Sequence, residues 1–451
     1  MIQRFSFGHP FPTQSVVLSL PAESGPVPFL TPDGSGWQLT LSEQAAVYGL
    51  GEMPRGINKR GWHYITNNTD ESRHSEDKLS FYGAHNFLLM RDGSTCFGLF
   101  VDFPGKVYYD IGYTRHDLFS FHTETPDYDL YLLSGENENA ICKEFRTLIG
   151  RSYIPPRWAF GLAQSRWGYK TEEDVREVAR QYKEHDLPLD MICMDIDYMQ
   201  DYADFTVNRE RFPDLAKLSA DLKAQGIRLV PIIDAGVRID PNDPTCTEGL
   251  EKGYFCKKAD GTPFVAAVWP GKAYFADFLR PEVREWFGHK YKALTDCGIE
   301  GFWNDMNEPS LFYSPERLRA FLNDMAALRE KDNIEQEEFF PRVVGGAMGL
   351  MNSPADYASF YHEVDGQKVR HDQVHNLYGG SMTRAAGEAF ADLRPGQAGR
   401  HAARGHSGHR RERPSGPRPA EADLPPPGHR GHPGNRRPTA GSSWCFPAQP
   451  S

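Results

Sequence analysis

The stretch Trp303-Asn304-Asp305-Met306-Asn307-Glu308-Pro309 follows a short, mainly apolar segment that runs from Gly298 to Phe302. The segment predicts a buried strand, and this strand leads into two carboxylates. Ionised carboxylates are costly to bury without a partner, so they are poor core material. A parallel barrel carries its catalytic groups at the C-terminal ends of its strands. The stretch therefore indicates a carbohydrate-cleaving site with Asp305 as nucleophile, and the alternative is that Asp305 only caps the following turn.

Strands and helices alternate along the chain on both sides of this stretch. The patterns predict strands over 158–164, 191–197, 228–235 and 301–307, and helices that begin at Thr171 and cover 214–225, 281–297 and 377–393. Nearly continuous apolar strands that alternate with helices are typical of a parallel sheet covered by helices. We assign residues 151–395 to this α/β region. Two long insertions, 238–275 and 310–375, follow the third and fourth strands, where a barrel builds its binding site.

Residues 1–150 have a different pattern, with short apolar runs broken by Gly, Pro, Asp and Asn. Such runs occur at 15–20, 87–90, 96–101 and 129–133, and a short helix is expected at 138–148. Closely spaced short strands with turn residues between them predict an all-β sandwich. The fold class is therefore multi-domain, an N-terminal β-sandwich followed by an α/β region.

Composition restricts the class of protein and the compartment. The 451 residues have a formal net charge of −11, which argues against binding to nucleic acid and fits an enzyme of neutral substrates. The seven cysteines contain no CxxC pair, which indicates free thiols in a reducing compartment. We see neither a signal peptide nor an apolar run of membrane-spanning length. We expect a cytoplasmic protein with no membrane partner.

Residues 396–451 consist mostly of Arg, Pro, Gly, Ala and His, and they lack Ile, Val, Met, Tyr and Lys. Such a segment cannot bury enough apolar surface to fold, so we predict a disordered tail. The composition is also what a GC-rich gene gives when it is read out of frame, and a frameshift or gene fragment is the preferred explanation. The alternative is a basic tail that recruits nucleic acid, although it contains no repeat and no interleaved aromatic residues.

The motifs taken together resemble glycoside hydrolase family 31, the α-glucosidase family. The catalytic motif of that family matches Trp303 to Glu308. Further matches are, in chain order, Tyr48 to Glu52, Asn68 to Asp70, Pro155 to Trp158, Gln164 to Tyr169, Asp195 to Met199, Val268 to Gly271 and Asp277-Phe278. The resemblance covers about residues 45–395 and implies an eight-stranded (β/α)8 barrel, of which the chain holds about four strands. Two unpaired strand edges would favour association, so a homo-oligomer is possible.

The resemblance also implies site residues and a retaining mechanism. Asp305 is the nucleophile, Glu308 supports it, and Asp195 and Asp70 bind sugar hydroxyls. Trp167, Val237, Trp269, Trp303 and Met306 form the apolar walls against which the sugar packs. Asp195 and Asp197 are two residues apart, and we choose Asp195 because we expect the strand to end between them. The acid/base Asp of the family lies on a later strand, and no matching motif follows residue 397.

The expected function is hydrolysis of non-reducing-end α-glucosyl linkages of oligosaccharides, impaired by the missing acid/base region. The alternatives are a non-catalytic glycan-binding relic and a related α-xylosidase or transglucosidase. His371 and His375 are four residues apart, like two metal ligands on a helix, but no third ligand has suitable spacing. We therefore expect no metal and no cofactor.

Overall fold

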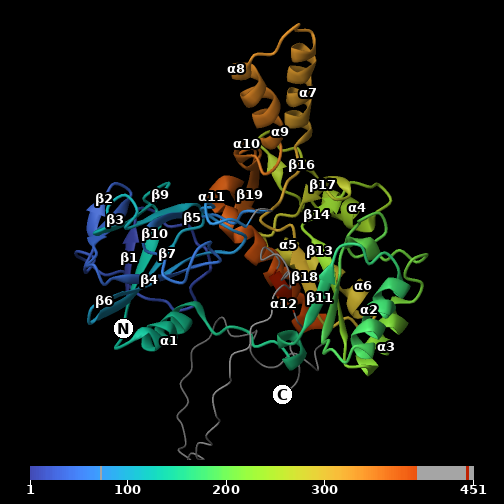
Figure 1. Cartoon of the computed structure of the whole chain (residues 1–451), viewed down its shortest axis with the longest axis horizontal. Helices are drawn as coiled ribbons and strands as arrows, with labels where there is room; N and C mark the ends of the chain where they lie inside the picture. The colour runs from blue at the N-terminus through green and yellow to red at the C-terminus, as the bar shows by residue number, and fades with distance from the viewer. Residues whose placement is uncertain (72–73, 394–442, 446–451) are drawn as a thin grey trace, which may run out of the picture.

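Two antiparallel β-sheets of five strands each form the N-terminal sandwich in the computed structural model, which describes residues 1–71, 74–393 and 443–445 (Figure 1). The first sheet has the order β1 (Ile2–Phe7), β10 (Tyr128–Ser134), β7 (Thr95–Asp102), β6 (Ala84–Asp92) and β4 (Ala46–Gly51). The second has the order β2 (Thr31–Asp33), β3 (Gly36–Thr40), β9 (Leu118–Thr123), β8 (Val107–Ile111) and β5 (Trp62–Thr66). The sandwich confirms the predicted all-β fold.

The core of the sandwich follows from the alternation of side chains along its strands. Leu88, Leu99 and Leu130 of the first sheet are buried in one cluster with Tyr109 and Phe119 of the second. Helix α1 (Glu138–Ile149) covers the outer face of the first sheet, where its Ile141 and Leu148 pack with Leu133. The apolar residues of each strand therefore serve either the space between the sheets or the contact with α1.

The strand predicted at 15–20 is wrong, because no strand of the described residues lies between β1 and β2. The alternate residues Val16, Leu18 and Leu20 instead pack against the cluster that α1 forms with the first sheet. The backbone N–H of Val17 donates to the carbonyl oxygen of Leu148 at 2.9 Å. The apolar side chains of this run therefore pack against a helix, and the run does not pair with a neighbouring strand.

Four parallel strands follow one another in chain order in the α/β region: β11 (Ala163–Arg166), β12 (Met191–Met194), β13 (Arg228–Asp234) and β18 (Phe302–Asp305). The backbone of β21 (Ser443–Cys445) pairs with β18 in the antiparallel direction. The helices that accompany this sheet are α2 (Glu172–Glu184), α3 (Leu215–Ala224), α5 (Pro281–Lys290), α6 (Lys292–Thr295) and α12 (Tyr378–Leu393). Figure 1 shows α2 and α3 side by side on the outside of the strands. Apart from β21, the predicted tail lies outside the described residues.

Several predicted boundaries in this region need correction. The strand predicted at 158–164 is wrong at its start, because Trp158 lies in the 3-10 turn η1 (Arg157–Phe160), and β11 begins only at Ala163. The predicted helix 281–297 is interrupted at Tyr291. The predicted strand 301–307 ends at Asp305, because Met306 has a φ of 56° and turns the chain.

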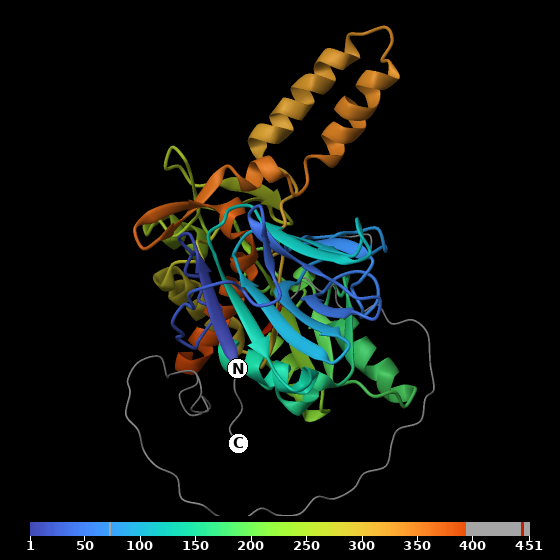
Figure 2. The ribbon, with the colours of Figure 1, turned by 90° about the vertical axis from the view of Figure 1, so that its left-hand side faces the viewer.

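The insertion after β13 forms a small sheet in the order β14 (Gly236–Arg238), β17 (Gly271–Phe275) and β16 (Val265–Val268), together with α4 (Pro244–Glu251) and β15 (Lys257–Lys258). The insertion after β18 forms α7 (Pro315–Arg329), α8 (Gln336–Glu338), the π-helix η3 (Phe339–Val344), α9 (Gly345–Met348) and α10 (Pro354–Tyr357). Figures 1 and 2 show that α7 and the segment from α8 to α9 form an arm that projects from the molecule.

The last part of the second insertion returns to the body of the molecule. It contains β19 (Phe360–Val364), β20 (Gln367–Arg370), α11 (His371–Val374) and the 3-10 turn η4 (His375–Leu377). β19 pairs with both β15 and β20, so one three-stranded sheet joins the two insertions. No helix in the described part of the chain is long and apolar enough to cross a membrane.

Candidate active site

Asp305 is the last residue of β18 and lies directly opposite Asp234, the last residue of β13, in the parallel register. The next residue, Met306, has a positive φ, a conformation that is uncommon for residues other than glycine. The backbone therefore leaves the sheet immediately after Asp305. Both carboxylates stand at the C-terminal edge of the sheet, as expected for the catalytic groups of a barrel.

Five carboxyl groups gather at this edge, and each is electrostatically coupled to others in the group. Besides burial, the charges of Asp195 and Asp70 raise the pKa of Asp305, and the charges of Asp305 and Asp70 raise the pKa of Glu308. The charges of Asp305, Asp195 and Glu308 raise the pKa of Asp234 in the same way. The structure therefore brings together four of the predicted site residues, Asp70, Asp195, Asp305 and Glu308. A compact set of carboxylates can attract a cation or a substrate that develops positive charge.

Burial raises the pKa of the Asp305 carboxyl to about 7, with further contributions from the charges of Asp195 and Asp70. A hydrogen bond from the backbone of Met306 acts in the opposite direction. Burial, followed by the charges of Asp305 and Asp70, raises the pKa of Glu308 well above its ordinary value. The site therefore holds one carboxyl group, Asp305, whose charge changes near neutral pH, as acid–base and nucleophilic chemistry requires.

Asp195 follows β12 and is half-buried, and its Oδ1 accepts a hydrogen bond from the backbone N–H of Ile196 at 2.8 Å. β12 ends at Met194, three residues before the predicted end at Asp197, because a 3-10 turn (η2, Ile196–Tyr198) follows it. Asp197 lies inside this turn and is buried, 3.9 Å from Nη1 of Arg211. Of these two carboxylates, Asp195 is the one whose charge acts on Asp305.

Asp70 comes from the N-terminal sandwich and reaches the same site. Its Oδ2 accepts a hydrogen bond from the hydroxyl of Ser310 at 2.6 Å, and Ser310 follows the catalytic stretch. The charges of Asp70, Glu308 and Asp305 all act on the phenol of Tyr82, whose pKa is raised mainly by burial. The sandwich therefore contributes one wall of the site as well as Asp70.

Asp234 is a site residue that sequence reasoning missed. Its backbone N–H donates to Oδ1 of Asp204 at 2.8 Å, and burial raises the pKa of both carboxyl groups well above the ordinary value. Oδ1 of Asp234 is buried and has no hydrogen-bond partner among the described residues. An unpaired buried oxygen of this kind suits a ligand hydroxyl. The rule that had selected Asp195 and Asp305, a carboxylate at the end of a parallel strand, could have found Asp234 as well.

The predicted apolar walls fall into two groups. Trp167 and Trp269 lie in turns after β11 and β16, with 64% and 48% of their surface exposed, and the ring of Trp269 meets that of Phe312 edge to face. Val237, Trp303 and Met306 are buried in the main hydrophobic cluster of the α/β region. The exposed indoles are available to a ligand, whereas the other three side chains are first of all part of the core.

His371 and His375, considered above as metal ligands, face each other, with Nε2 of His371 2.8 Å from Nδ1 of His375. At this distance the two ring nitrogens share a hydrogen bond, so they are not free to bind a common ion.

Comparison with known proteins agrees with this architecture. The model of the glycosyl hydrolases family 31 TIM-barrel domain matches residues 152–411, and the model of the glycosyl hydrolase 31 N-terminal galactose mutarotase-like domain matches residues 25–110. Alpha-glucosidase 2 of Bacillus thermoamyloliquefaciens is 38% identical over 330 residues, which cover 73% of this chain and 41% of that protein. An alpha-glucosidase of Saccharolobus solfataricus is 27% identical over 370 residues, which cover 80% of this chain and 50% of that protein.

Solved structures share the fold at low sequence identity. A GH31 dextranase of Flavobacterium johnsoniae in complex with isomaltotriose has a TM-score of 0.64 and 22% identity, with 82% of this chain and 40% of that chain covered. A GH31 alpha-xylosidase from a soil metagenome has a TM-score of 0.59 and 19% identity, with 82% and 46% covered. The chain belongs to glycoside hydrolase family 31, and it spans at most about half of the length of these relatives.

Proposed function

We propose that this chain carries the sugar-binding and nucleophile part of a retaining α-glucosidase-type hydrolase that acts on non-reducing-end α-glucosyl linkages of oligosaccharides. The observation that carries the proposal is the position of Asp305, at the end of β18 among Asp70, Asp195, Asp234 and Glu308. The two alpha-glucosidases among the relatives support the class of substrate.

The proposed chemistry needs an ionised Asp305. One of its oxygens attacks the anomeric carbon, the bond to the leaving group breaks, and a covalent glycosyl-enzyme forms. The transition state carries positive charge on the sugar ring, which the surrounding carboxylates stabilise. Asp195, Asp234 and Asp70 present oxygens that can accept hydrogen bonds from sugar hydroxyls. The two exposed indoles, Trp167 and Trp269, offer faces for the C–H groups of the sugar.

The leaving oxygen of a natural oligosaccharide needs a proton, which the acid/base carboxyl supplies in a retaining enzyme. Glu308 follows the nucleophile closely, and we assign it a supporting role. We propose that the acid/base is absent from the described residues and that this chain alone cleaves natural oligosaccharides poorly. A non-catalytic glycan-binding role is the second candidate, because a binding protein needs the carboxylate cluster but no acid/base.

The neighbouring α-xylosidase fold makes xylosides the alternative substrate class. A glucoside differs from a xyloside by its hydroxymethyl group, and the two alpha-glucosidases among the relatives favour the glucoside. We propose a cytoplasmic location for the chain. Free thiols in its described part support a reducing compartment. They are Cys96, Cys142, Cys193, Cys246, Cys256 and Cys297.

Binding of deoxynojirimycin, a cationic glucose-configured iminosugar, tests the proposal without requiring turnover. Calorimetry should show that the chain binds it, and that Asp305→Asn binds it at least about tenfold more weakly, a difference of about 1.4 kcal/mol. The xylose-configured iminosugar should bind more weakly than the glucose-configured one. Equal binding by the chain and by Asp305→Asn would remove Asp305 from the site, and preference for the xylose form would favour the xyloside alternative.

A further inference from the structure

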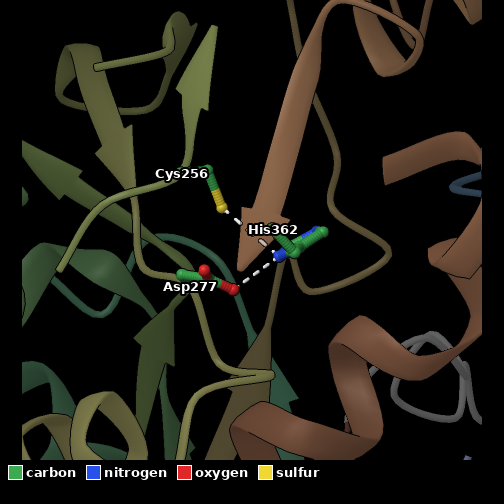
Figure 3. A group of neighbouring side chains, drawn as sticks. All are labelled: Cys256, Asp277 and His362. Atoms are coloured by element: carbon green, nitrogen blue, oxygen red, sulfur yellow. Dashed lines mark hydrogen bonds and ion pairs between the residues drawn. The ribbon is translucent and has the colours of Figure 1, made fainter. Parts of the chain in front are cut away.

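A continuous chain of hydrogen bonds runs through the interior from Asp277, which follows the first insertion, to the sandwich. Oδ1 of Asp277 lies 2.7 Å from Nδ1 of His362, and Nε2 of His362 lies 2.9 Å from Nδ1 of His371. His371 continues to His375 at 2.8 Å, and Nε2 of His375 lies 2.7 Å from the backbone carbonyl oxygen of Asn68. All four side chains are buried. Figure 3 shows the first link, with Asp277 and His362 pointing toward each other.

The two groups at the ends of this series of hydrogen bonds, Asp277 and Asn68, determine how many protons the series needs. The carbonyl oxygen of Asn68 can only accept a hydrogen bond, and so can an ionised Asp277 carboxylate. Four hydrogen bonds between two accepting ends need four protons. Three neutral imidazoles supply three, because each carries one N–H. The chain therefore holds one proton more than three neutral histidines do, and the ionised Asp277 places this proton on His362.

A metal ion is the other cation that could supply the missing positive charge. The ligand atoms of Cys256, Asp277 and His362 lie within 4.8 Å of one another (Figure 3). However, Oδ1 of Asp277 and Nδ1 of His362 are at hydrogen-bond distance, so the space between them fits a proton. Sγ of Cys256 lies 3.6 Å from Nδ1 of His362 and 3.7 Å from the carbonyl oxygen of Ala276. Burial raises the pKa of this thiol well above its ordinary value, so it keeps its proton. The geometry fits a stored proton.

The last hydrogen bond of the series, from His375 to Asn68, binds the loop that carries Asp70. Besides the bond from His375 to Asn68, Oδ1 of the neighbouring Asn376 accepts from the backbone N–H of Asn68 at 2.8 Å. Asp70 follows two residues later, beside Ser310 and Asp305. The position of Asn68 therefore determines where the Asp70 carboxylate stands in the proposed sugar site.

We propose that Asp277, His362, His371 and His375 are positioning residues, which store one proton and thereby fix the loop of Asp70 in the sugar site. The count of four protons stands on the four hydrogen bonds, and the assignment of the fourth proton to His362 stands on an ionised Asp277 carboxylate. Only the role of Asp70 rests on the proposed function. When the stored proton leaves, three protons remain for four hydrogen bonds, and one link of the chain must open.

The groups around the chain explain why the proton stays at the end where Asp277 lies. The titratable and charged groups that face it are Cys256, Arg280, Tyr357, Tyr378, Lys106 and Asp372. Burial raises the pKa of Cys256, Tyr357 and Tyr378 well above the ordinary values, so these three keep their protons. Burial lowers the pKa of His375 to about 4, and burial and the other two histidines lower that of His371. The Asp372 carboxylate acts on His375 only through its charge, whereas the Asp277 carboxylate is at hydrogen-bond distance from His362.

The substitution Asp277→Asn removes the need for the stored proton. An amide can donate to Nδ1 of His362 while its oxygen accepts from the backbone N–H of Glu363, which now donates to Asp277 at 2.8 Å. All four links then need only neutral histidines.

A count of histidine protons tests the stored proton directly. In a long-range proton–nitrogen spectrum of the histidine-labelled 451-residue chain at pH 8, we expect one imidazole with both nitrogens protonated. We expect it to be missing from Asp277→Asn and retained in the control Asp33→Asn, which changes an exposed aspartate of β2. The wild-type spectrum alone decides the question. A spectrum without a doubly protonated imidazole, or a metal that copurifies and binds Nδ1 of His362, overturns the proposal.

The positioning role is tested by binding of deoxynojirimycin and by hydrogen exchange. His371→Leu breaks the chain at its centre, and we expect about tenfold weaker binding together with faster exchange at residues 66–70. The control His9→Leu, at an exposed histidine, should change neither. Unchanged binding and exchange in His371→Leu would overturn the positioning role. Failure of the wild-type chain to bind the iminosugar would instead overturn the proposed function, while the spectrum still decides the proton count.

Discussion

At the scale of single residues, the site depends on carboxyl groups held close together at the end of a sheet. The family resemblance implied Asp305, Glu308, Asp195 and Asp70 as site residues, and the structure places all four in one cluster. Sequence reasoning missed Asp234 although it too ends a predicted parallel strand, and only the register of the sheet shows that it lies opposite Asp305. Only the structure shows that Oδ1 of Asp234 is buried without a hydrogen-bond partner among the described residues.

The raised pKa of Asp305 predicts how its reactivity depends on pH. Only the ionised carboxylate attacks an anomeric carbon, and the pKa lies at about 7. The rate at which α-glucosyl fluoride labels the chain should therefore increase as the pH rises through about 7 and then level off. Mass spectrometry of samples quenched between pH 5 and pH 9 would measure these rates. A rate that is flat across neutral pH would show that Asp305 ionises as an ordinary carboxyl group.

The same shift predicts an effect on stability. A carboxyl group whose folded pKa is raised contributes stability below its unfolded pKa of about 3.9, and the contribution is lost as the pH rises through about 7. Asp305→Asn removes this loss, so at pH 8 the variant should melt above the unchanged chain, by about 1 °C for each kcal/mol gained. The two should converge near pH 4. Thermal melts at both pH values test this, and a lower melting temperature for the variant at pH 8 would contradict the assignment.

At the scale of helices and strands, the sequence predicted which elements exist better than where they end. Strands followed by helices were recognised, because their apolar residues repeat with clear periods. The ends of β12, β18 and α5 were not, since each is set by local backbone geometry, such as the positive φ of Met306 and the 3-10 turn after Asp195. The apolar run at 15–20 was misassigned because its packing partner, α1, lies more than a hundred residues later.

Close packing of α5 against α12 gives a prediction at this scale. A Cβ at Gly288 of α5 would come within 2.2 Å of the backbone carbonyl oxygen of Ala385 in α12. Gly288→Ala should therefore destabilise the chain by about 1–3 kcal/mol, because the helices must move apart. Gly387→Ala is the matched control, since it lies in α12 with no atom within 4 Å of its Cβ, and there alanine should stabilise by up to about 1 kcal/mol. Denaturant unfolding of both variants measures the difference, and equal stabilities would refute the close contact.

At the scale of the whole molecule, the sandwich and the α/β region meet at the site. Asn376 joins them, because its Nδ2 donates to the carbonyl oxygens of Thr66 and Gly105 at 3.1 and 2.8 Å, and its Oδ1 accepts from Asn68. The sequence indicated two regions and a shared site, but it did not show which residues connect them. Contacts between segments more than 250 residues apart follow no local pattern.

Replacement of Asn376 tests this connection. Asn376→Asp would place a carboxylate against two carbonyl oxygens, and we expect a loss of about 2–4 kcal/mol of stability from the broken and unsatisfied hydrogen bonds. Hydrogen exchange should accelerate at residues 66–70, whereas the control Asn333→Asp, at an exposed position, should behave like the unchanged chain. Exchange that stays slow at 66–70 in Asn376→Asp would show that other contacts hold the two regions together.

The central claim is that this chain presents a glycosidase nucleophile at Asp305, and covalent labelling tests it most directly. α-Glucosyl fluoride needs little protonation of its leaving group, so attack by Asp305 releases fluoride and leaves a hexosyl unit on the carboxylate. Digestion and mass spectrometry should locate the added hexosyl unit on Asp305, and Asp305→Asn should reduce the labelling rate by about 10⁴-fold or more. A label on another carboxylate, or unchanged labelling of Asp305→Asn, would contradict the account.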